Sequence, residues 1–239
     1  MAKLYFKYGA MGSSKTAQAL ITRFNYMELG MSVWLIKPSV DTRDGADVIK
    51  SRIGLEARAQ VITPEQDIIA EYQKQPGHDV IIADEAQFFT PAQIDQLRQL
   101  VDEEDIPVLC FGLRTDFLTH FFPGAQRLME LADSLTEIKT VCACGRKATV
   151  NARIDASGRI ITQGTRSFWA AMTAMWPCAT NAGSSASGNR KKRKPARTKK
   201  EESPGIKRDF LPFLFRQLRR SRPRISSRPS REAAIMAKA

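Results

Sequence analysis

A short segment near the start of the chain has the residue types and spacing of a loop that holds phosphate groups. Residues 9–16 read G-A-M-G-S-S-K-T and follow the apolar residues 4–6. Small residues let backbone N–H groups close around an anion, and the helix expected directly afterwards would direct the positive end of its dipole at the phosphates. Lys15 would reach the β- and γ-phosphates, and the Thr16 hydroxyl would hold Mg²⁺. The segment therefore predicts a site for a nucleoside triphosphate.

The loop departs from the usual pattern G-x-x-x-x-G-K-[ST] at one position, since Ser14 stands where the second glycine is expected. On this segment alone, a Gly/Ser turn that merely joins a strand to a helix remains an alternative. A second motif decides between the two. Asp84 and Glu85 follow the apolar residues 80–83, which are typical of a parallel strand buried on both faces.

These two acids have different expected roles. Because side chains alternate along a strand, Asp84 and Glu85 should point to different sides. We expect Asp84 to hold Mg²⁺ and Glu85 to act as a general base. The alternative, two solvated acids at a strand end, is disfavoured by the phosphate loop upstream.

The elements that position these residues alternate between strand and helix. Strands are expected near residues 3–8, 32–37, 59–62, 79–83 and 107–111, and helices near 15–29, 46–50, 65–74, 91–103 and 124–132. This alternation predicts an α/β fold, a mostly parallel sheet with helices on both faces. In such sheets a ligand binds at the carboxyl ends of the strands, where the phosphate loop and the two acids both lie.

The net charge of +12 comes entirely from the last third of the chain. Residues 165–239 hold 19 Lys and Arg against 4 Asp and Glu, whereas residues 1–164 hold 18 against 21. Beyond residue 183, Ser/Gly repeats lead to R-K-K-R-K at 190–194 and then to Arg-, Ser- and Pro-rich sequence. This composition cannot bury a core and predicts a disordered tail.

The sequence also indicates a compartment. No apolar run approaches the twenty residues of a membrane span, and no signal peptide precedes the first expected strand, so we expect no membrane partner. Four cysteines without such a signal favour a reducing cytoplasm over a disulfide framework. Of these, Cys110 falls on an expected buried strand and is interpreted as a core residue.

Four segments have a distinctive composition, namely Y-G-A-M at residues 8–11, K-P-S-V-D-T-R at 37–43, D-E-A-Q-F-F at 84–89 and F-G-L-R-T-D-F at 111–117. Together they resemble the type II thymidine kinases, the cytosolic, tetrameric family. The resemblance covers residues 1–164 almost continuously. It implies a RecA-like P-loop kinase domain over residues 1–139, a homotetramer, and nucleotide salvage in which ATP, with Mg²⁺, phosphorylates the 5′-hydroxyl of thymidine or deoxyuridine.

The resemblance also implies roles for individual residues. Glu85 would be the catalytic base that takes the proton of the sugar hydroxyl. Mg²⁺ would be held by Thr16 and Asp84, and Asp41 and Arg43 are possible phosphate or sugar contacts. ATP-binding positions are Gly9, Ala10, Met11, Gly12, Ser13, Ser14, Lys15, Thr16, Asp84, Glu85, Ala86 and Gln87. A thymine pocket would be lined by Met11, Phe88, Leu113, Phe117 and Phe122, with ordinary core packing as the alternative for the aromatic residues.

The family pattern stops after residue 164. Cys142 and Cys144 would begin its small zinc-binding domain, here residues 140–164, as half of a tetrahedral Zn²⁺ site. The second close cysteine pair is missing, since only Cys178 follows. Also missing is the family's G-G-N-D-R-Y loop, which folds over the nucleoside.

The genetic code suggests why this loop is missing. Read two bases out of frame, TGG for Trp169 followed by GCN for Ala170 forces glycine, and ATG for Met172 followed by ACN for Thr173 forces aspartate. The neighbouring triplets permit the rest of G-G-N-D-R-Y. We therefore hypothesise a frameshift near Gly164, which makes residues 165–239 an aberrant tail. Such a chain would bind ATP but phosphorylate thymidine poorly, because it lacks the loop that shields the nucleoside from water.

Two other functions remain open on the sequence. The first is a P-loop ATPase whose basic tail binds nucleic acid, although the slightly acidic balance of residues 1–164 counts against it. The second is a non-catalytic nucleotide-binding subunit of a native oligomer. Nucleic-acid binding by the tail is not expected to be functional.

Overall fold

The computed structural model describes residues 1–42, 45, 47–154, 160–161 and 175–179. The chain divides into one unit over Met1–Asn189 and a second over Arg190–Ala239, which lies outside the described residues. The boundaries expected at 139 and 164 both fall inside the first unit. The expected disordered tail lies outside the described residues, apart from 175–179.

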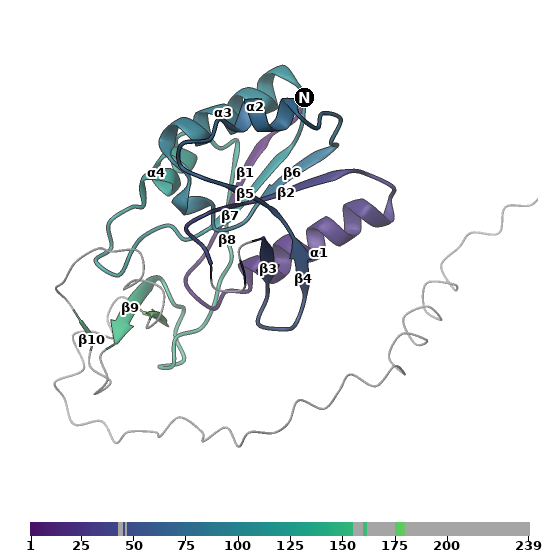
Figure 1. Ribbon diagram of the computed structural model, residues 1–239. Helices are drawn as coiled ribbons and strands as arrows, with labels where there is room; N and C mark the ends of the chain where they lie inside the picture. The colour runs from purple at the N-terminus through teal and green to yellow at the C-terminus, as the bar shows by residue number, and fades with distance from the viewer. Residues whose placement is uncertain (43–44, 46, 155–159, 162–174, 180–239) are drawn as a thin grey trace, which may run out of the picture. The chain divides into compact units, whose positions relative to one another are not determined.

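The first unit is built on a six-stranded sheet in the order β5-β2-β6-β7-β1-β8 (Figure 1). All neighbouring strands in it are parallel, with Phe6 opposite Cys110 and Ile81 opposite Val108. The parallel sheet expected from the sequence is confirmed. The strands are β1 (Leu4–Tyr8), β2 (Val33–Pro38), β5 (Gln60–Ile62), β6 (Val80–Ala83), β7 (Val108–Gly112) and β8 (Ser134–Glu137).

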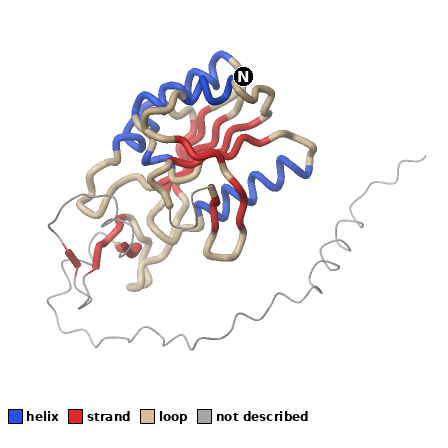
Figure 2. The backbone as a smooth tube through the Cα atoms, in the orientation of Figure 1, coloured by secondary structure: helices blue, strands red, loops and turns tan. Residues whose placement is uncertain are grey.

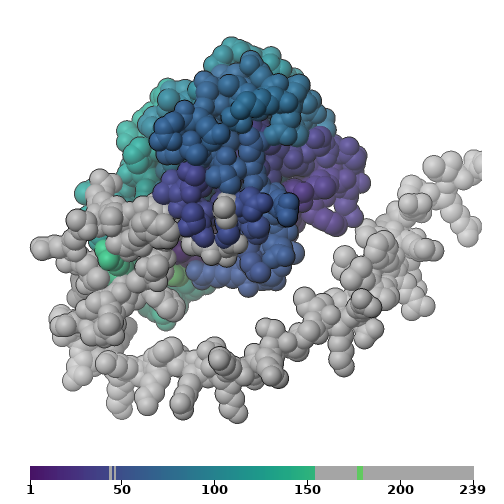
Figure 3. Space-filling model, viewed as in Figure 1, coloured from purple at the N-terminus to yellow at the C-terminus, as the bar shows by residue number. Residues whose placement is uncertain are grey.

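Helices cover both faces of this sheet, as expected (Figures 1 and 2). On one face lie α2 (Ile68–Gln73), α3 (Pro91–Glu103) and α4 (Pro123–Leu131), which form a continuous surface in the space-filling view (Figure 3). On the other face lies α1 (Lys15–Glu28). Each face of the sheet has its own hydrophobic core. Because side chains alternate along β6, Ile81 and Ala83 belong to the core that contains residues of α3, whereas Val80 and Ile82 belong to the core that contains residues of α1.

Local sequence signals set the starts of two helices. α3 begins with a capping box, in which the Thr90 hydroxyl accepts from the Gln93 N–H and the Gln93 side chain accepts from the Thr90 N–H. Pro91 occupies its first turn. The Asp67 side chain caps α2 by accepting from the Ala70 N–H. Among the described residues, no helix is long and apolar enough to cross a membrane.

The helix expected at residues 46–50 is wrong. Val48–Lys50 instead forms β3, which pairs antiparallel with β4 (Glu56–Arg58). The β-branched Val48 and Ile49 favour a strand, and the burial of Ile49 between two less buried neighbours follows a strand period. A segment of five residues is too short for a helical period to show.

A second, three-stranded sheet lies at the end of the described chain. Its order is β10-β9-β11, with β9 (Val150–Ile154) paired antiparallel to both β10 (Ile160–Ile161) and β11 (Met175–Cys178). The last of these strands belongs to the segment expected to be a disordered tail, so the expectation is corrected for these residues. The physical reason is that Cys178 and Ala179 are buried against Cys142 and Ala148.

Candidate active site

The phosphate loop lies between β1, which ends at Tyr8, and α1, which begins at Lys15. Gly9 leaves no space for a side chain, because a Cβ there would lie 2.4 Å from the Ile138 carbonyl oxygen and 2.5 Å from Ser13 Oγ. Ser13 N–H donates to the Ala10 carbonyl oxygen over 3.3 Å. The tight turn that the sequence predicts is present, and it opens directly into a helix N-terminus.

Ser14 has φ 61° and ψ 25°, in the left-handed region. The pattern requires glycine at this position because glycine adopts such angles without steric cost. A serine there costs roughly 1 kcal/mol and still lets the loop keep its path. Serine at position 14 therefore strains the backbone locally, but the phosphate loop still forms.

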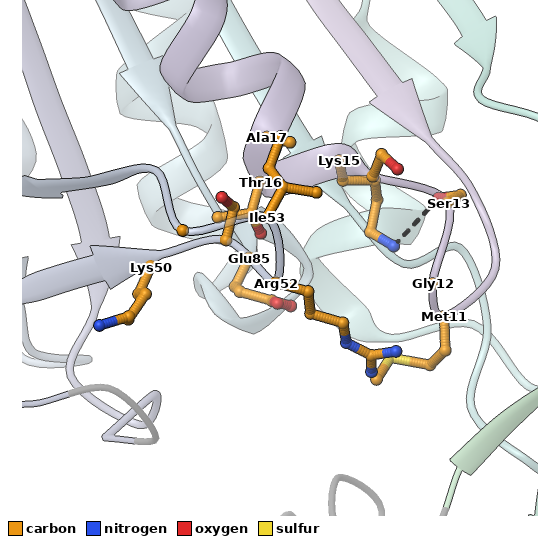
Figure 4. A pocket seen from close by; sticks show the side chains of 13 residues that line it. Met11, Gly12, Ser13, Lys15, Thr16, Ala17, Lys50, Arg52, Ile53 and Glu85 are labelled. Atoms are coloured by element: carbon orange, nitrogen blue, oxygen red, sulfur yellow. Dashed lines mark hydrogen bonds between the residues drawn. The ribbon is translucent and has the colours of Figure 1, made fainter. Parts of the chain in front are cut away.

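The Lys15 ammonium lies inside the loop itself (Figure 4). Its Nζ donates to the carbonyl oxygens of Ala10 at 3.0 Å and Gly9 at 3.3 Å, and it lies 3.4 Å from Ser13 Oγ. The side chain is buried. The carbonyl groups thus hold a positive charge where an incoming triphosphate would meet it.

The two acids follow β6, and β7 lies between that strand and β1. Asp84 is buried and hydrogen-bonded to the Thr16 side chain, so the structure brings together the two residues expected to hold Mg²⁺. Burial, and then the charge of Glu85, raise the pKa of Asp84 from its ordinary 3.8 to about 7, although Thr16 and Lys15 lower it. A divalent cation there would offset both causes of the shift, so the pair fits Mg²⁺.

Glu85 does not continue the strand, which ends at Ala83. Its φ of 49° is left-handed, and it turns the chain into the short 3₁₀ helix η1 (Ala86–Phe88). Both acids lie beyond the end of β6, so the expected alternation along a strand does not apply to them. Gln87 Nε2 donates to Glu85 Oε2 over 2.6 Å, and Gln87 Oε1 accepts from the Leu113 N–H over 2.8 Å. The carboxylate is thereby fixed to the chain that follows β7.

A cavity of about 540 Å³ lies between the phosphate loop and the turn of the β3–β4 hairpin (Figure 4). Residues 11–17 line one side and residues 50–54 the other, with Glu85 between them. Residues 11–16 and Glu85 were expected from the sequence, whereas Ala17 was not. The second set was missed, because a helix was expected at 46–50 and no element or role at 51–54. Ala86 and Gln87, expected as ATP contacts, are buried and are not among the described residues that line this cavity.

The residues expected to line a thymine pocket do come together. Met11, Leu113 and Phe117 form one buried cluster, and Phe122 packs against it. The rings of Phe88 and Phe122 are 5.3 Å apart and meet edge to face. These apolar groups therefore lie beside the phosphate loop, at the carboxyl ends of β6 and β7.

Asp41 forms a buried ion pair with Lys37, with 3.4 Å between Lys37 Nζ and Asp41 Oδ2. The Lys37 ammonium also donates to the carbonyl oxygens of Gly45 and Val48 at 3.3 and 3.0 Å. Lys37 therefore fixes the segment between β2 and β3. The other possible phosphate or sugar contact, Arg43, lies outside the described residues.

Asn151 on β9 links the second sheet to the phosphate loop, a link that no local pattern in the sequence indicates. Its Oδ1 accepts from the Met11 N–H over 2.8 Å, and its Nδ2 donates to the Thr115 carbonyl oxygen over 3.0 Å. The side chain is buried. The carbonyl oxygen of Gly12 accepts from the Thr140 hydroxyl over 3.3 Å. The outer side of the loop is thus held by residues after 139.

Three cysteines gather near the second sheet, where the sequence indicated a pair. Cys142 and Cys178 share a buried cluster, and Cys144 is exposed beside them. Burial and the neighbouring Cys142 raise the pKa of Cys178 to about 11, while hydrogen bonds from Arg146 lower that of Cys144 to about 7. Cys142 and Cys144 were expected as half of a zinc site, and no group of three or more His, Cys, Asp or Glu side chains in the described part of the chain could hold a metal ion. Cys110 is fully buried on β7, as expected of a core residue.

The family model of thymidine kinase matches residues 2–174. Thymidine kinases from Ruegeria pomeroyi and phage T4 are 45% and 42% identical to the chain over 169 residues, which cover 70% of this chain and 85% and 88% of those proteins. That of Zymomonas mobilis is 48% identical over 168 residues, or 69% of this chain and 86% of its own. A solved complex of Pif1 helicases at forked DNA is 16% identical over 57% of the chain and 39% of the helicase chain, and its TM-score of 0.34 supports no inference.

Proposed function

Since the chain belongs to the thymidine kinase family, we propose that ATP is the phosphoryl donor and that the reaction serves nucleotide salvage. The acceptor would be the 5′-hydroxyl of thymidine or deoxyuridine. The observation that carries this proposal is the position of Glu85, which lines the same cavity as the phosphate loop. A general base and a phosphate-binding loop facing one cavity are what a transfer from a triphosphate to an alcohol requires.

The chain's own groups account for each part of the reaction. The N–H groups at the start of α1 and the Lys15 ammonium would hold the phosphates and balance their charge. Glu85 would take the proton from the sugar oxygen as that oxygen forms a bond to the γ-phosphorus and ADP leaves. Gln87 holds the carboxylate in place by its 2.6 Å hydrogen bond. Magnesium bound at Thr16 and Asp84 would neutralise charge on the phosphate oxygens.

The nucleoside would lie against the apolar cluster of Met11, Leu113 and Phe117. Flat aromatic and aliphatic surfaces bind a base by excluding water. Met11 belongs both to this cluster and to the phosphate loop, so the sugar would lie between the two and its 5′-oxygen would face the triphosphate. We infer a cytoplasmic homo-oligomer, as in the family.

The last part of the chain would limit this activity. The matches to the curated relatives extend over 168 or 169 residues. From the family resemblance we infer that a nucleoside-covering loop and a second cysteine pair are missing from this sequence. The segment in question, 162–174, lies outside the described residues. We infer that the chain binds ATP but turns over thymidine more slowly than a variant whose frame is restored after Gly164, because water reaches the reacting groups.

A single assay tests the proposal. Thymidine-dependent formation of ADP is measured with the purified chain and with the frame-restored variant, and guanosine serves as the control nucleoside. Thymidine monophosphate should form with the restored variant and much more slowly with the chain itself. Equal rates in the two proteins would contradict the proposed impairment. ATP turnover that does not depend on thymidine in either protein would contradict the proposed thymidine kinase activity. Sequencing the gene around codon 164 tests the frameshift directly.

A further inference from the structure

The turn of the β3–β4 hairpin forms the wall of the cavity opposite the phosphate loop, and hydrogen bonds within the turn fix its shape. Ser51 N–H and Ser51 Oγ both donate to the Leu55 carbonyl oxygen, over 2.8 and 3.1 Å, and Leu55 N–H donates back to Ser51 Oγ over 3.0 Å. Gly54, with φ 89°, donates to the Ser51 carbonyl oxygen. A turn closed in this way presents its side chains from a defined backbone.

Arg52 extends from this turn toward the phosphate loop. Its Nη1 lies 3.8 Å from the position that a Cβ on Gly12 would occupy. The close view draws Arg52 and Met11 among the side chains that line the cavity (Figure 4). The side chain is exposed, and it makes no hydrogen bond or ion pair with any residue that the structure describes.

The other cations of the hairpin have acidic partners. Lys50 Nζ lies 3.0 Å from Glu56 Oε2, and Arg58 Nε lies 3.9 Å from Asp47 Oδ2. Arg52 thus differs from its neighbours in having no acid beside it within the described residues. The planar guanidinium group of Arg52 can donate two parallel hydrogen bonds to a phosphate group. The phosphate loop lies on the opposite side of the same cavity.

We propose that Arg52 binds the terminal phosphate of ATP across the cavity from the phosphate loop. This deepens the proposed function and rests on it. The loop N–H groups would surround a triphosphate from the side of α1, so a cation on the hairpin side would meet its outermost phosphate. Arg52 would supply that cation and stabilise the charge that develops on the phosphate oxygens during transfer.

Binding of ATP, ADP and AMP to the purified full chain, measured by calorimetry with Mg²⁺, tests this assignment. In Arg52→Ala, ATP should bind roughly tenfold more weakly and ADP less than about threefold, as expected when a charge-assisted hydrogen bond to one phosphate is lost. Arg52→Lys should lose less ATP affinity than Arg52→Ala, because lysine keeps the positive charge but lacks the paired donors of the guanidinium group. Arg58→Ala removes the same charge from the same hairpin outside the cavity and should change neither affinity.

Three results would overturn the assignment, namely unchanged ATP affinity in Arg52→Ala, equal losses for ATP and ADP, or an equal loss in Arg58→Ala. Because Arg52 is exposed and bonded to no described residue, Arg52→Ala should melt at the temperature of the unmutated chain. Failure of the unmutated chain to bind any of the three nucleotides would instead remove the proposed function itself, together with this role.

Discussion

The Asn151 side chain accepts a hydrogen bond of 2.8 Å from the backbone N–H of Met11, 140 residues earlier in the chain. Its amide group also donates to the Thr115 carbonyl oxygen, so one buried side chain joins β9, the phosphate loop and the segment after β7. Ala10 of the loop packs against the buried cysteine cluster of the same region. The shape of the phosphate loop therefore depends on residues outside the main sheet.

Asn151→Ala should weaken nucleotide binding as well as stability. Removing the side chain leaves the Met11 N–H and the Thr115 carbonyl buried without partners, at a cost of roughly 1–3 kcal/mol. We expect urea unfolding to show this loss and ATP to bind several-fold more weakly. ATP affinity equal to that of the unmutated chain, at full folding, would show that the loop keeps its shape without Asn151.

Ser14→Gly should stabilise the protein. Glycine relieves the left-handed strain at φ 61°, and the gain should be about 0.5–1 kcal/mol after the added flexibility of the unfolded chain is counted. Ser13→Gly is the matched control, because Ser13 is buried without a positive φ and should lose stability. Thermal melts of the three proteins give the comparison; a lower melting temperature for Ser14→Gly would contradict the strain.

Glu85→Gln should abolish thymidine phosphorylation in the frame-restored protein while leaving ATP binding in place. A general base contributes about 10²–10⁴-fold to a rate, so we expect at least a hundredfold loss of turnover. Gln87→Ala should cost less, because it frees the carboxylate from its 2.6 Å hydrogen bond without removing it. A steady-state assay with both variants separates the roles, and turnover that survives in Glu85→Gln would assign the base elsewhere.

The stability of the metal-free protein should fall as pH rises from about 4 to about 7. Burial and the Glu85 charge raise the pKa of Asp84 from 3.8 to about 7, so within this window the native state keeps a proton that the unfolded state has lost. The stabilisation from protonated Asp84 is therefore complete below the pKa of the unfolded state and is lost as the pH rises through the pKa of the folded state. Melting temperatures in EDTA check this.

Asp84→Asn is the control for this pH dependence, since the amide cannot titrate. Its melting temperature should vary less with pH between 4 and 7 than that of the unmutated protein, and added Mg²⁺ should raise the melting temperature of the unmutated protein more than that of the variant. Identical pH profiles for both proteins would show that Asp84 does not titrate in this range.

Much of the fold could be predicted because its elements repeat over several residues. The apolar runs of β1, β6 and β7 and the helix that follows the loop are visible locally. The strands β3 and β4 have three residues each and are too short to show a period, so a helix was expected at 46–50 and no element at β4. The cavity wall at Arg52 was missed for the same reason.

The candidate site divides in the same way. Lys15, Asp84 and Glu85 could be predicted because they lie in short motifs whose residue types and spacing indicate a phosphate-binding site. Asn151 contacts residues distant in the sequence, and Arg52 lies near Gly12 only in the folded chain, so no neighbouring residue in the sequence indicates either position. Cys178 likewise joins Cys142 only because β11 pairs with β9. Such contacts depend on tertiary structure, which local periodicity does not encode.

The backbone angle at Ser14 has a consequence for how nucleotide sites are recognised in genomes. A search pattern that requires glycine before the lysine excludes other residue types. The loop requires only a residue that can adopt left-handed backbone angles at this position. Serine meets that requirement at a small energetic penalty. Searches that admit serine, asparagine or aspartate at this position should recover enzymes that stricter expressions discard.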